Sequence, residues 1–83
     1  MNRPKIYKTK HRLVDAIKWT GSNFAVVAEF ANGSFFIIDE MPYIRGPHGK
    51  IPVLTNDYIV KGVDGNYRPI APSIFREVYE NVQ

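Results

Sequence analysis

The two histidines are the side chains of this chain that could act as a base for a nucleophilic hydroxyl group. His11 lies between Lys10 and Arg12, whose charges disfavour a protonated imidazole. His48 lies in a Gly-Pro-His-Gly sequence, which is typical of a turn. We interpret His11 as an exposed residue of a terminal segment and His48 as a loop residue, with a contact role for His48 as the alternative.

Metal and acid–base chemistry have equally little support in the sequence. A zinc site needs three or four close ligands, and two distant histidines in a chain without cysteine do not supply them. Two carboxylate pairs could perform acid–base work, but their positions are typical of solvated surface charge: Asp39 with Glu40, and Glu77 with Glu80. The glycines at 62 and 65 match no phosphate-binding loop. We therefore predict a protein without enzyme activity, metal or cofactor.

Length and composition predict one folded domain. A chain of 83 residues leaves room for one domain, and its 45% hydrophobic and 13% aromatic content is too high for a disordered chain. The lack of cysteine excludes disulfides and favours a reducing compartment. No run of residues approaches the roughly 20 apolar side chains of a membrane span. We expect a cytoplasmic protein that has no membrane partner.

The positive charge is concentrated near the N-terminus. Residues 1–19 hold six basic side chains and one acidic side chain, whereas residues 20–83 hold five basic and seven acidic ones. Pro4 and the lack of sustained periodicity predict that residues 1–12 form a basic arm in front of the first strand. Such an arm can approach a polyanion, and it can equally be a feature that promotes solubility.

Hydrophobic spacing predicts an α+β fold over residues 13–83, with a mainly antiparallel sheet of about five strands. One helix follows the first strand and a second lies at the C-terminus. Trp19 is expected in the core, and the first strand is expected to be covered on both faces. The predicted elements are strand 13–19, helix 24–31, buried strand 34–39, a hairpin around loop 46–50, strand 57–62, strand 67–70 after the Asp64-Gly65 turn, and a helix from Pro72.

Two blocks of the sequence resemble the motifs of a known protein family. Residues 14–21 read Val-Asp-Ala-Ile-Lys-Trp-Thr-Gly, and residues 55–80 contain Asp-Tyr-Ile-Val-Lys-Gly-Val and end in Ile-Phe-Arg-Glu-Val-Tyr-Glu. Together they resemble a family of small tailed-phage and prophage proteins with a Pro-Gly-Asp-Tyr motif (PGDYG-like). This chain has Thr55-Asn56 in place of Pro-Gly, and Arg68 in place of an aromatic residue. The resemblance implies a phage origin and an intracellular setting, and it implies no active site.

Three functions stay open at this point. The leading hypothesis is a non-enzymatic phage accessory protein that binds a host or phage protein. The alternative is nucleic-acid binding through the basic arm, with Trp19 stacking a base if it is exposed. The third is a small nucleotide-binding module, and a homo-oligomer is compatible with each. The candidate contact residues are Arg3, Lys5, Lys8, Lys10, Arg12, Lys18, Tyr58, Lys61, Tyr67 and Arg68.

Overall fold

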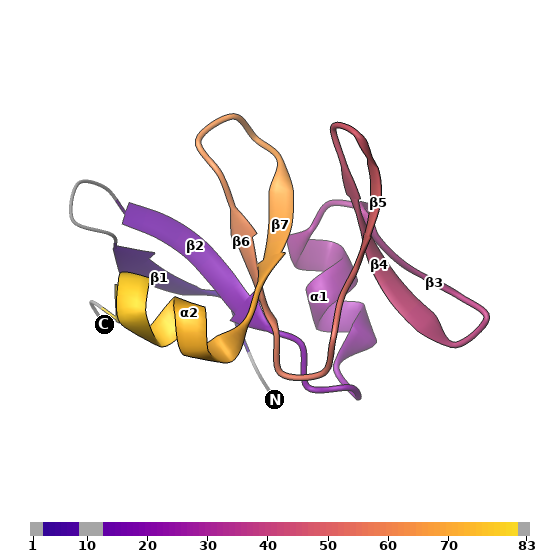
Figure 1. The fold of residues 1–83 in the computed structure, drawn as a ribbon, viewed down its shortest axis with the longest axis horizontal. Coiled ribbons are helices and arrows are strands. Elements are labelled where there is room, and N and C mark those ends of the chain that lie inside the picture. Colours follow the sequence, from indigo (N-terminus) through magenta and orange to yellow (C-terminus); the bar gives the residue numbers. More distant parts are fainter. Residues whose placement is uncertain (1–2, 9–12, 82–83) are drawn as a thin grey trace.

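Two antiparallel sheets and two helices make up the fold, which the computed structural model describes for residues 3–8 and 13–81 (Figure 1). The larger sheet has the strand order β7-β6-β2-β1-β8, and the smaller sheet has the order β3-β4-β5. The elements, in chain order, are β1 (Lys5–Lys8), β2 (Leu13–Lys18), α1 (Phe24–Phe30), β3 (Phe35–Ile38), β4 (Met41–Gly46), β5 (Gly49–Pro52), β6 (Tyr58–Lys61), β7 (Tyr67–Ile70), α2 (Pro72–Val78) and β8 (Glu80–Asn81).

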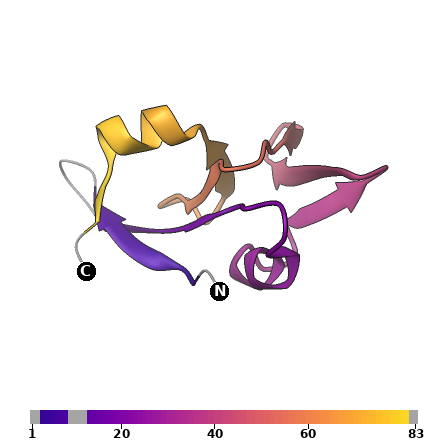
Figure 2. The same cartoon turned by 90° about the horizontal axis from the view of Figure 1, so that it is seen from below.

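The larger sheet is covered on both faces, as the sequence of its first long strand predicts. Side chains alternate along β2, so that Ala16 and Ile17 point to opposite sides of the sheet. Ala16 packs in a cluster with Phe75 of α2, whereas Ile17 packs in a cluster with Val27 of α1 and with the smaller sheet. Figure 2 shows the two helices on opposite sides of β2. The core therefore consists of two clusters separated by one sheet.

The helix α1 begins at Phe24, as predicted, and ends at Phe30, one residue before the predicted end. Asn23 precedes it, but its side chain turns back toward β2: Nδ2 donates to the Lys18 carbonyl at 2.8 Å, and Oδ1 accepts from the Thr20 N–H at 2.9 Å. Asn23 therefore fastens the end of β2 instead of capping the helix. At the other end Gly33 has φ +84 and its N–H donates to the Ala28 carbonyl at 3.2 Å, which closes the helix.

The fold class is α+β, as predicted, but the sheet arrangement differs from the prediction. The single sheet of about five strands is in fact two sheets, with eight strands among the described residues. Residues 5–8, expected to belong to an arm, form β1 and pair with β2 from Lys5 opposite Ala16 to Lys8 opposite Leu13. Backbone hydrogen bonds make this pairing and do not depend on the side chains. Because the segment carries charged side chains, its hydrophobic pattern does not indicate the strand.

The strand β3 is also less buried than its four apolar residues predict. Phe35 is buried, but Ile37 and Ile38 are each 45% exposed. The smaller sheet lies at one end of the molecule, where core residues of the larger sheet reach the first part of β3 (Figure 1). The continuous apolar run therefore predicts the strand correctly, but the prediction that the whole strand is buried is wrong.

Both hairpins of the smaller sheet have two-residue turns. Gly46 pairs with Gly49, so the β4–β5 turn is shorter than the predicted five-residue loop. The edge strand β5 ends at Pro52, a position that tolerates a residue without an N–H donor. Among the described residues, no helix is long and apolar enough to cross a membrane.

The β3–β4 turn has a backbone that its residues do not favour. Asp39 and Glu40 both have positive φ, at 49° and 68°, in a turn that usually carries Asn-Gly. A non-glycine residue in this region costs roughly 1 kcal/mol. We expect Glu40→Gly to raise the free energy of unfolding by about 0.5–1 kcal/mol, measured by urea denaturation. Glu40→Ala removes the same charge and keeps the Cβ, so an equal gain for both variants would refute the backbone explanation.

Candidate binding surface on the smaller sheet

The outward side of the smaller sheet carries an aromatic pair. Phe35 and Ile44 point into the core, so their neighbours Phe36 and Tyr43 point away from it. Phe36 and Tyr43 are register partners on β3 and β4, and their rings stack at a centroid distance of 5.9 Å and an angle of 27°. Both side chains are half-buried. The pair forms a small apolar platform on the side of the sheet that faces away from the core.

A cation accompanies each ring of this pair. The Arg45 guanidinium lies 5.3 Å from the centroid of Phe36, and the Lys50 Nζ lies 5.3 Å from the centroid of Tyr43. Arg45 and Lys50 are themselves register partners on β4 and β5. Cation–π contacts at exposed sites contribute only about 0.5–1 kcal/mol, so both cations can move toward an anion without a large loss. We call Phe36, Tyr43, Arg45 and Lys50 together the outer face.

A pocket of about 320 Å³ adjoins the outer face at Lys50. It lies between the β4–β5 turn and β7, which is the edge strand of the larger sheet. None of its lining residues is acidic, and three of them carry basic side chains. The lining residues are Pro47, His48, Gly49, Lys50, Ile51, Tyr67 and Arg68.

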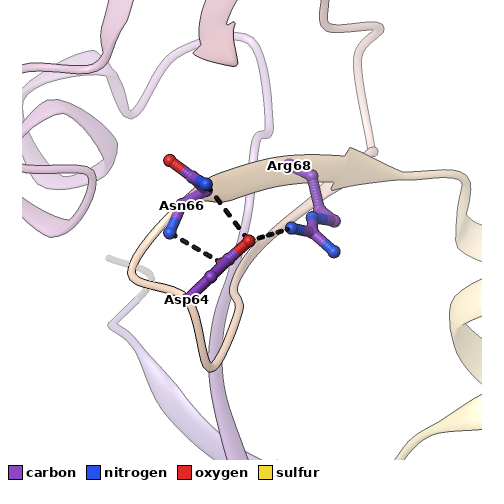
Figure 3. A network of polar contacts seen from close by, with 3 residues as sticks. All are labelled: Asp64, Asn66 and Arg68. Atoms are coloured by element: carbon purple, nitrogen blue, oxygen red, sulfur yellow. Dashed lines mark hydrogen bonds and ion pairs between the residues drawn. The ribbon is translucent and has the colours of Figure 1, made fainter. Parts of the chain in front are cut away.

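Arg68 is held at this pocket by a network in the β6–β7 turn (Figure 3). Its Nη2 lies 3.3 Å from Oδ2 of Asp64. Asn66 donates to the same carboxylate twice, from its backbone N–H at 3.0 Å and from Nδ2 at 3.1 Å. The hydrogen bonds from Asn66, first the backbone one and then the side-chain one, hold the pKa of Asp64 below its ordinary value, and the charge of Arg68 adds to the effect.

The order of these causes gives a testable result. Asn66→Ala is expected to raise the pKa of Asp64 more than Arg68→Gln does, measured by NMR titration of the carboxyl carbon. Because the folded-state pKa is depressed, the ionised Asp64 stabilises the turn above the ordinary aspartate pKa of about 3.9, and this contribution is lost as the pH falls through the lower folded value. Asn66→Ala keeps the backbone hydrogen bond to Asp64, so a larger rise for Arg68→Gln would show that the ion pair outweighs the Asn66 side-chain hydrogen bond.

Comparison with known protein families, curated proteins and solved structures finds no match to this chain. The resemblance to small phage proteins therefore stays a prediction.

The structure places the predicted contact residues in several separate regions. Arg3 and Lys5 are exposed at β1, and Lys8 ends that strand. Lys10 and Arg12, like His11, lie outside the described residues. Lys18 and Tyr58 are register partners on β2 and β6, and Lys61 and Tyr67 are register partners on β6 and β7. Among the candidates whose side chains the structure describes, Tyr67 and Arg68 line the pocket.

The conspicuous motif residues contribute mainly to folding. Trp19 is buried and meets Phe35 edge to face at 5.0 Å, so it is no base-stacking side chain. Asp57 is buried and its Oδ2 accepts the Leu54 N–H at 2.9 Å. The Tyr58 ring stacks on Phe75 at 3.8 Å. Trp19, Asp57 and Tyr58 therefore take part in the packing and hydrogen bonding of the fold.

Sequence reasoning missed the outer face completely. The hydrophobic pattern predicts a buried strand at Phe36 and predicts only the arms and the loop of a hairpin for Tyr43, Arg45 and Lys50. The available signal was the alternation of Tyr43 with Ile44 and of Lys50 with Ile51, which separates an inward from an outward side. The alternation alone does not show that the four residues lie together. The register between the three strands must also be known.

Proposed function

We propose that this chain is a non-enzymatic protein that binds single-stranded nucleic acid on the outer face of its smaller sheet. The observation that supports the proposal is the stacked pair of Phe36 and Tyr43 with a cation beside each ring. Single-strand binding surfaces combine aromatic rings, on which bases stack, with basic groups for the phosphates. The four side chains supply both components on one face of three adjacent strands.

The charges of the smaller sheet set the direction in which a strand would lie. The β4–β5 end carries Arg45, Lys50 and His48, whereas the β3–β4 turn carries Asp39 and Glu40. A polyanion is attracted to the first end and repelled from the second. The backbone of the bound strand therefore passes the β4–β5 hairpin, with its bases directed toward the ring pair.

This proposal moves the nucleic-acid hypothesis from the basic arm to the smaller sheet. The two locations lie in different sheets, since Arg3 and Lys5 belong to the β1 region and Arg45 and Lys50 to the β4–β5 hairpin. Substitutions at the two places therefore separate the two hypotheses.

The test is binding of fluorescently labelled 12-nucleotide DNA and RNA, followed by anisotropy over a range of salt concentrations. Each neutralised phosphate of a single strand contributes roughly 0.7 to the slope of log K against log salt. We expect Arg45→Gln with Lys50→Gln to lower both the affinity and the slope, the slope by about 1 to 1.5. The matched control, Arg3→Gln with Lys5→Gln, should change the slope less. Absence of binding at low salt would refute the proposal, and the reverse ranking of the two double variants would support the arm.

A protein partner is the second candidate, and an apolar area favours it. Phe24 of α1 and Ile37 of β3 are 43% and 45% exposed, and both lie beside the buried Phe35. Under this candidate, the phage accessory protein of the resemblance acts in the cytoplasm of an infected or lysogenic bacterium. Nuclease-resistant capture of one stoichiometric host protein, abolished by Ile37→Lys, together with an absence of oligonucleotide binding, would favour it.

A further inference from the structure

We propose that the pocket between the β4–β5 turn and β7 holds the phosphate of a nucleotide unit next to the bases stacked on the outer face. The inference rests on the proposed function, because Lys50 belongs both to the outer face and to the lining of the pocket. A strand that stacks on Tyr43 thus has a neighbouring phosphate within the reach of this second group of cations. The ligand class is a nucleoside monophosphate, free or as part of a chain.

The size and lining of the pocket agree with such a ligand. Its volume of about 320 Å³ is at the small end of the range for small-molecule sites, roughly 300–1,000 Å³. Lys50 and Arg68 supply basic side chains, and His48 adds a ring N–H donor. Ile51 and the Tyr67 ring give the pocket an apolar wall suited to a sugar or base edge. Charge and shape together favour a small organic anion over a neutral ligand.

Two of the side chains that line the pocket, Tyr67 and Arg68, are held by contacts within the protein in the absence of a ligand. The Tyr67 ring meets Phe30 of α1 edge to face at 5.5 Å. The Arg68 guanidinium is held by Asp64, which Asn66 orients in turn. A side chain already held in place loses less conformational freedom on binding. Arg68 is therefore a preorganised phosphate contact, and Asp64 is a positioning residue.

Gly62 is what makes room for this arrangement. A Cβ at position 62 would lie 2.8 Å from Oδ1 of Asp64 and 3.3 Å from Nη2 of Arg68. The glycine thus allows the carboxylate and the guanidinium to meet directly beside the backbone of the turn. Gly62→Ala displaces the pair without replacing any residue that lines the pocket.

The test is an NMR titration of the full chain with uridine 5′-monophosphate, adenosine 5′-monophosphate, inorganic phosphate and uridine. We expect both nucleotides to shift the amide signals of His48, Gly49, Lys50, Tyr67 and Arg68, and uridine to bind at least about tenfold more weakly. Arg68→Gln should weaken nucleotide binding about tenfold, and Gly62→Ala should weaken it by a smaller factor. Arg76→Gln on α2 is the matched control, because it removes an exposed arginine elsewhere and should have no effect.

Three outcomes would overturn the inference. Equal binding of uridine and the nucleotides would show that no phosphate is recognised. Equal losses for Arg68→Gln and Arg76→Gln would show that only net charge matters. Absence of shifts at the pocket, in a protein whose oligonucleotide binding is intact, would refute the pocket and leave the outer face standing. If the unsubstituted protein does not bind oligonucleotides at all, the proposed function is refuted instead.

Discussion

Replacing Phe75 with alanine is expected to lower the free energy of unfolding by about 3–5 kcal/mol. Phe75 is 3% exposed and is the buried side chain of α2. Its ring stacks on the rings of Tyr58 and Tyr79. The centroid distances are 3.8 Å and 4.7 Å, and the interplanar angles are 5° and 19°. Phe75 also packs with Ala16 and Val60 on one face of the larger sheet. Its removal therefore leaves a cavity and takes away the contact that holds α2 against the sheet.

Such a loss would be a large part of the total stability. A domain of this length has a free energy of unfolding of about 4–12 kcal/mol. Urea denaturation at neutral pH measures the change, and Ile74→Ala on the same helix is the control, because Ile74 is 50% exposed. We expect the control to cost less than about 1 kcal/mol. Similar losses for the two variants would mean that the aromatic stack does not anchor the helix.

The double replacement of Phe36 and Tyr43 by leucine is expected to weaken oligonucleotide binding about 10- to 100-fold. A base stacked on an aromatic side chain contributes roughly 1–3 kcal/mol, and leucine keeps apolar volume without a flat ring. Both residues point away from the core and contact one another on the outer face. The effect should therefore appear in the affinity, with little change in the free energy of unfolding.

The experiment repeats the anisotropy measurement over the same range of salt concentrations as before. Phe24→Leu is the matched control, because Phe24 is an exposed aromatic residue of α1 whose ring contacts Phe35 on the inward side of the sheet. The salt slope of the double variant should stay near that of the parent protein, since Arg45 and Lys50 remain. An affinity that is unchanged in the double variant, or lowered equally by Phe24→Leu, would exclude the ring pair as a stacking platform.

Most of the local structure could be predicted from neighbouring residues. The strand at 67–70, the turn at Asp64-Gly65 and the helix that begins at Pro72 agree with the structure, because alternation, turn residues and a proline in the first helical turn act over short distances. This second helix spans only Pro72–Val78. Tyr79 has the extended values φ −114° and ψ 148°, which end the helix, and Val78 is left exposed.

The spacing of apolar side chains within single elements predicts the α+β class, the burial of Trp19 and the two covered faces of β2. It did not determine how the strands divide between two sheets or which side of β3 faces the core. Only the register of three strands brings Phe36, Tyr43 and Lys50 onto one face. The two-residue turns fix that register, but which side of the sheet faces the core depends on the burial of Phe35 and Ile44 against residues distant in the sequence.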